Sequence, residues 1–119
     1  MMNDESNLKH RTKEFAIRVI KLYSALPKST EAQVIGKQIL RSGTSVGAQY
    51  REACRARSNA EFISKMESGL QELDETSYWL ELLIDGRFVK AERLESLQDE
   101  TNQLTAIFVA SVKTVKSKK

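Results

Sequence analysis

The chain has 119 residues, of which 40% are hydrophobic and 29% are charged, and its formal net charge is +3. This composition is sufficient for one globular domain with an apolar core and excludes a largely disordered chain. A disulfide framework is excluded because Cys54 is the only cysteine, and a membrane span because no apolar run approaches ~20 residues. The first ten residues, MMNDESNLKH, lack the pattern of a signal peptide. We therefore expect a soluble cytoplasmic protein that makes no membrane contact.

The basic character of the chain is concentrated in a basic C-terminal tail, residues 113–119. The net charge falls from +3 to −1 once four lysines are left out of the sum, namely Lys113, Lys116, Lys118 and Lys119. A basic patch on the rest of the chain must therefore arise from the arrangement of residues.

The first predicted helix spans about residues 7–26. It ends before Pro27, which cannot donate a helix hydrogen bond and restricts the residue before it. Its apolar side chains recur at intervals of three and four residues and share one helical face: Phe15, Val19, Leu22 and Leu26.

The second predicted helix spans about residues 30–57 and contains Gly43 and Gly47. Each glycine costs about 1 kcal/mol relative to alanine inside a helix. At 100° per residue, four cations nevertheless stay within a sector of about 80° across the glycines: Lys37, Arg41, Arg51 and Arg55. Because the cations keep the same angular position before and after the glycines, the pattern indicates one continuous helix. The glycines would let a neighbouring helix approach closely, and a local kink or 3₁₀ turn is the alternative.

Capping signals locate the other helix ends. Thr30 with Gln33 three residues later predicts a capping box for the second helix, with Ser29 as the alternative cap, and Ser58 with Glu61 predicts the start of the third. The third helix covers about residues 59–85 and should end with Gly86 in the left-handed conformation. Its apolar stripe is Phe62, Met66, Gly69, Leu70, Leu73, Leu80 and Ile84.

The fourth predicted helix spans about residues 89–115, with a stripe of Leu94, Leu97, Leu104, Phe108, Val112 and Val115. Four amphipathic helices joined by short connections predict an all-α fold, an up-down-up-down antiparallel four-helix bundle that fills residues 1–119 as a single domain.

No group of residues predicts catalysis, a metal or a cofactor. His10 is the only histidine, and no Glu-x-x-His motif is present, which excludes a di-iron bundle. The glycine-containing stretch lacks the Gly-Lys-Ser/Thr triplet and preceding strand of a phosphate-binding loop. Cys54 projects toward the apolar side of its helix, as a small hydrophobic residue would. We expect a protein that is not an enzyme.

Three interpretations of the cationic sector remain open. It can be a solvated polar face, a set of ion pairs with the acidic flank of the third helix, or a phosphate-binding surface. Glu52 lies next to Arg41 in projection, so the sector also holds a negative charge. Tyr78 and Trp79 project away from the apolar stripe, which indicates either an oligomer contact or an edge of the core.

The runs ILRSGTSVGAQYREACRARS and GLQELDET-YWLELL (Ser77 in the gap) resemble the four-helix proteins encoded in intervening sequences of bacterial 23S rRNA genes. The accessory variability protein of diversity-generating retroelements has a similar fold. The resemblance covers about residues 15–83. The chain differs where much of the family has proline at Gly47, asparagine at Gln49 and glycine at Ala53, and these departures argue against a proline-driven kink here.

The resemblance implies a ring-like homopentamer, and association with RNA or with a reverse transcriptase. It brings no catalytic residues. In such a ring Glu52, Glu72, Tyr78 and Trp79 would be subunit contacts.

Two hypotheses follow. The first is a non-enzymatic, oligomeric protein that binds nucleic acid, either RNA or DNA, through Lys37, Arg41, Arg51 and Arg55. The second is an assembly or adaptor protein in which the arginines pair with Glu52 and Glu72 within or between subunits.

Overall fold

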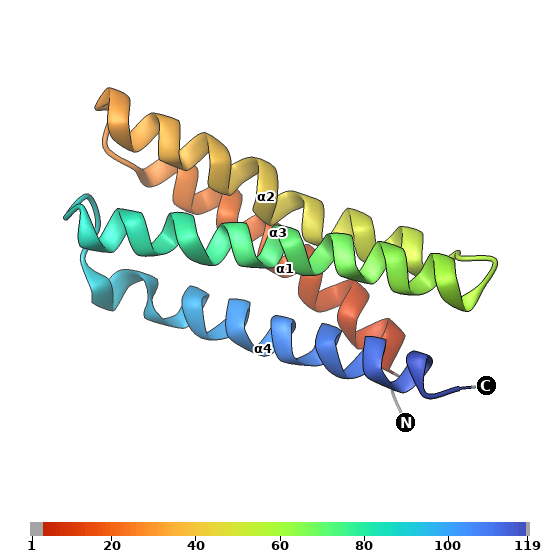
Figure 1. Cartoon of the computed structure of the whole chain (residues 1–119). Helices are drawn as coiled ribbons and strands as arrows, with labels where there is room; N and C mark the ends of the chain where they lie inside the picture. Colours follow the sequence, from red (N-terminus) through yellow and green to blue (C-terminus); the bar gives the residue numbers. More distant parts are fainter. Residues whose placement is uncertain (1–3, 119) are drawn as a thin grey trace.

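The computed structural model describes residues 4–118 and folds them into four helices connected by short turns. These are α1 (Asp4–Ala25), α2 (Thr30–Cys54), α3 (Asn59–Asp85) and α4 (Ala91–Lys116). Successive helices run antiparallel, and both ends of the chain lie at the same end of the bundle (Figure 1). The described residues contain no strand. The predicted all-α four-helix bundle is confirmed.

One continuous apolar core runs through the bundle. Helices α2 and α3 share the most extensive contact, α1 packs on α2 and α4 packs on α3, whereas α1 and α4 meet over only a short stretch. The largest side chains with almost no exposed surface are Phe15, Phe108, Ile39, Met66, Leu73, Leu80, Leu83 and Leu104. The predicted apolar stripes therefore do face the core.

Side-chain caps determine where α2 and α3 begin. The Ser29 hydroxyl accepts a hydrogen bond from the Ala32 amide at 3.3 Å, so Ser29 is the cap of α2. The Ser58 hydroxyl accepts one from the Glu61 amide at 3.1 Å, as the sequence predicts. Helix α2 ends at Cys54, earlier than the expected end near residue 57. The Arg55 amide donates to the carbonyls of Glu52 and Ala53, and its φ of −101° departs from the helical value.

The end of α3 differs from the prediction. Gly86 keeps a right-handed φ of −79°, and the residue with the left-handed φ, 64°, is Arg87. The amides of Phe88 and Val89 both donate to the Leu83 carbonyl, at 2.9 and 3.2 Å. This turn places the left-handed residue one position later than expected, at Arg87. For the same reason α4 begins at Ala91 and not near Val89.

The glycines of α2 serve close packing against α1. Helix α2 is continuous through Gly43 and Gly47, with no 3₁₀ turn. A Cβ added at Gly43 would lie 2.7 Å from a methyl of Val19, and one at Gly47 would lie 3.1 Å from the Thr12 hydroxyl. Close approach of α1 therefore explains both residues, as the sequence indicates.

Candidate interaction surfaces

The outer face of α2 carries the predicted cations. Lys37, Arg41, Arg51 and Arg55 are all exposed, and the first and last are separated by about 27 Å at 1.5 Å per residue. Within the described residues, Lys37 and Arg51 form no ion pair, so their charges face solvent.

The ion pairs between α2 and α3 differ from those expected. Arg41 donates to Glu75 at 2.9 Å, and Lys65 of α3 pairs with Glu52 of α2 at 2.7 Å. Hydrogen bonding and attraction from Lys65, with a smaller effect of Arg55, lower the pKa of Glu52. Arg41 therefore does pair with the acidic flank of the third helix, although its partner in the chain is Glu75 and not Glu72, and Glu52 pairs with Lys65 and not with an arginine. Pairing of the arginines with Glu52 and Glu72 between subunits stays a prediction.

The α3 face around Tyr78 and Trp79 contains polar atoms without partners. Tyr78 is 53% exposed and its ring lies edge-on to Trp79, with ring centroids 5.1 Å apart. The indole nitrogen of Trp79 and one carboxylate oxygen of Glu72 are buried and have no hydrogen-bond partner among the residues that the structure describes. Desolvation, reinforced by Glu75 and opposed by Arg41, raises the pKa of Glu72. Trp79 also packs against the core, as the edge-of-core alternative predicts, and a buried polar atom without a partner costs free energy at this face.

The lysines near the C-terminal end belong in part to α4. Lys113 and Lys116 occupy its last turn, and Lys116 pairs with Glu67 of α3 at 3.4 Å. Lys118 is exposed, and Lys119 lies outside the described residues. The predicted basic tail is thus partly an ordered helix end.

The residue types that metal binding would need form no cluster in the part of the chain that the structure describes. His10 is exposed on α1, and Cys54 is half-buried at the end of α2. Residues 4–118 contain no group of three or more histidine, cysteine, aspartate or glutamate residues able to hold a metal ion. No helix among them is both long enough and apolar enough to span a membrane.

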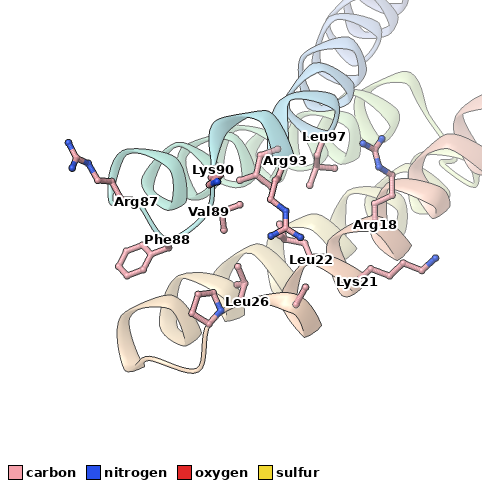
Figure 2. Close-up of a pocket in the computed structure, with 13 residues that line it drawn as sticks. Arg18, Lys21, Leu22, Leu26, Arg87, Phe88, Val89, Lys90, Arg93 and Leu97 are labelled. Carbon is pink, nitrogen blue, oxygen red and sulfur yellow. The ribbon is translucent and has the colours of Figure 1, made fainter.

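The structure also has a surface that the sequence analysis missed, a groove between α1 and the start of α4. We name it the α1–α4 groove; its volume is about 760 Å³ and its lining comes from residues 18–27 and 87–97. Figure 2 shows Arg93 extending from α4 toward Leu22 of α1, with Phe88 at one end and Arg18 at the other. The sequence contains the cations that line this groove, in the run RFVKAER and at Arg18 and Lys21. Only the fold brings these two segments together.

Comparison with known proteins identifies the family. The profile described as 23S rRNA-intervening sequence protein matches residues 4–110. The chain belongs to this family. The crystal structure of a protein of unknown function from the S23 ribosomal protein family of Bacteroides thetaiotaomicron is 40% identical to it. That similarity covers 92% of this chain and 97% of the other, with a TM-score of 0.86. A search among curated proteins gave no match.

Proposed function

We propose that this member of the intervening-sequence family is a non-enzymatic, oligomeric protein that binds structured RNA through the outer face of α2. The observation that carries the proposal is the row of exposed cations, in which Lys37 and Arg51 form no ion pair within the described residues. Arginine and lysine on such a face attract phosphates, and each contact releases counterions. Repetition of the face in an oligomer would multiply weak contacts.

The RNA proposal is tested by fluorescence anisotropy with a labelled RNA hairpin over a range of salt concentrations. Lys37, Arg51 and Arg55 are replaced together by glutamate, which we call the α2 variant; Arg41 is kept because it pairs with Glu75. We expect at least a tenfold loss of affinity, and a log–log salt slope smaller in magnitude by about three phosphate contacts. Unchanged affinity would overturn the proposal.

A second variant separates the lysines of the C-terminal end from the α2 face. This variant carries glutamine in place of four lysines: Lys113, Lys116, Lys118 and Lys119. Substitution is used and not truncation because α4 continues to Lys116 and Val112 is buried, so a shorter chain would lose part of the helix. Binding that survives these changes supports the α2 face. Binding that depends on them alone contradicts it.

The second candidate function is assembly, with a homo-oligomer or an adaptor role, and the α3 face supports it. The support is the exposed ring of Tyr78 against the half-buried Trp79, since exposed aromatic side chains are enriched at protein interfaces. The resemblance to the retroelement accessory protein extends this candidate to a reverse transcriptase as partner.

Assembly is tested by light scattering coupled to size-exclusion chromatography. Tyr78→Glu should reduce the oligomer to a smaller species, because the charge would have to be buried in the interface. Val34→Glu on α2 is the matched control, since Val34 is 56% exposed and Tyr78 is 53% exposed. If both variants keep the wild-type mass, the α3 face is not the contact.

A further inference from the structure

The α1–α4 groove has an aliphatic floor. Four leucines form most of it: Leu22 of α1, Leu26 just beyond the end of α1, and Leu94 and Leu97 of α4. Ala25, Pro27 and Val89 complete the apolar lining. Leu22 and Val89 are only half-buried although they pack against the core. The bundle therefore leaves apolar side chains partly uncovered where α1 and α4 diverge.

Cations line both edges of the groove, and none of its lining residues is acidic. Arg18 and Lys21 lie on the α1 edge, and the other edge carries Arg93 of α4 with Arg87 and Lys90 of the α3–α4 turn. Arg18 donates to the Ser96 hydroxyl at 2.9 Å, and none of the five forms an ion pair within the described residues. Five positive charges around an apolar floor make this groove complementary to a ligand that is both acidic and apolar.

The groove is held in shape from both ends. At one end Arg11 of α1 pairs with Glu100 of α4 at 2.7 Å and also donates to Gln103 at 3.1 Å. At the other end the amides of Phe88 and Val89 are fixed to the Leu83 carbonyl. A preformed groove avoids part of the ordering cost of binding.

We propose that the α1–α4 groove binds an acidic amphipathic helix from a partner protein. Such a helix presents an apolar stripe flanked by carboxylates, and this pattern matches an aliphatic floor with cations along both edges. A fatty acid would need its cations at one end only. Single-stranded RNA would need aromatic platforms for its bases, and Phe88 is the only aromatic residue in the lining. The site is separate from the α2 face and does not rest on the RNA proposal.

The probe is a fluorescein-labelled peptide, LEELLEELEELLEE, which places six leucines on one helical face and glutamates on both sides. Its binding to the full chain is followed by anisotropy. The matched peptide has the same composition with the leucines distributed evenly around the helix. We expect the amphipathic peptide to bind at least tenfold more tightly than its shuffled counterpart, because only the former can place a stripe on the floor.

The groove variant replaces Lys21, Lys90 and Arg93 with glutamate. All three are exposed, so the fold should survive, which circular dichroism checks. The α2 variant is the matched control because it has the same net charge. We expect the groove variant to lose peptide affinity about tenfold or more while keeping RNA affinity, and the α2 variant to do the reverse. Leu22→Ala should also weaken binding of the peptide, and it does so without changing the net charge of the protein.

Four results would overturn the proposal. The first is no binding of the amphipathic peptide at about 0.5 mM, a concentration high enough to detect a weak complex. The second is equal binding of the shuffled peptide, and the third is an equal loss of peptide affinity in the groove and α2 variants. The fourth is binding of phosphatidylglycerol vesicles, but not of the peptide, with vesicle binding abolished in the groove variant. The last would assign the groove to a membrane surface. If the groove binds no peptide but the wild-type protein still binds RNA, the groove proposal is wrong and the proposed function is unaffected.

Discussion

The α2–α3 contact and the α1–α4 side of the bundle are built in opposite ways. Along α2 and α3 the helices pack closely, and the buried Ser42 and Thr76 hydroxyls bond across the contact at 2.8 Å. Helices α1 and α4 meet chiefly through the Arg11–Glu100 pair and diverge beyond it into a groove. The closed contact supplies stability, whereas the open side leaves apolar and cationic groups available for a partner.

The sharpest test of this contrast makes one substitution on each side. Leu80 is fully buried on α3, so Leu80→Ala should lower the free energy of unfolding by about 2–5 kcal/mol. Leu22 is half-buried at the groove, so Leu22→Ala should cost only about 1 kcal/mol. Urea unfolding measures both, and similar losses would show that the groove side is as well packed as the core.

A smaller effect tests the approach of α1 to α2. Gly43→Ala gains about 1 kcal/mol of helix propensity but pushes a Cβ into both methyls of Val19, a stiff and fully buried side chain. Overpacking of this kind costs about 1–3 kcal/mol, so we expect a net loss of about 1 kcal/mol.

Gly47→Ala is the control for this substitution. Its nearest atom, the Thr12 hydroxyl, is 3.1 Å away, so stability should stay within about 1 kcal/mol of wild type. Equal effects of the two alanines in thermal unfolding would contradict the close-packing explanation of Gly43.

The smallest expected effect concerns pH, and Glu72 and Glu52 should act with opposite signs. Because desolvation raises the pKa of Glu72, its folded state binds the proton more tightly, and stability falls as pH rises through the range above 4.5. Because Lys65 lowers the pKa of Glu52, stability is lost as pH falls below 4.5.

Urea unfolding between about pH 3 and 7 tests these signs. Glu72→Gln should be slightly more stable than wild type at neutral pH, and that gain should vanish in acid. Glu52→Gln should be slightly less stable at neutral pH, with the difference also vanishing in acid. A stabilising Glu52→Gln would show that the Lys65 pair does not hold in solution.

The sequence predicted the helices and most of their ends because these depend on neighbours a few residues away. The periodic apolar positions, Pro27 and the Ser58 cap are all local signals. The same holds for the glycines of α2, whose absent side chains indicated close packing before α1 was known to be the neighbour.

The features that sequence could not supply depend on distant segments. Whether Arg41 meets Glu72 or Glu75 is set by the register of α3 on α2. The left-handed φ at Arg87 depends on two amides sharing the Leu83 carbonyl. The groove joins residues about 70 positions apart, so no pattern along the chain marks it.

Trp79 is the only tryptophan of the chain, and it lies on the α3 face in contact with the half-exposed Tyr78. All indole emission of the protein therefore reports on that one surface. A dilution series read by intrinsic fluorescence would follow association there without a label, and Trp79 is not among the residues that line the α1–α4 groove. The molecule thus carries a built-in optical probe of association at the α3 face.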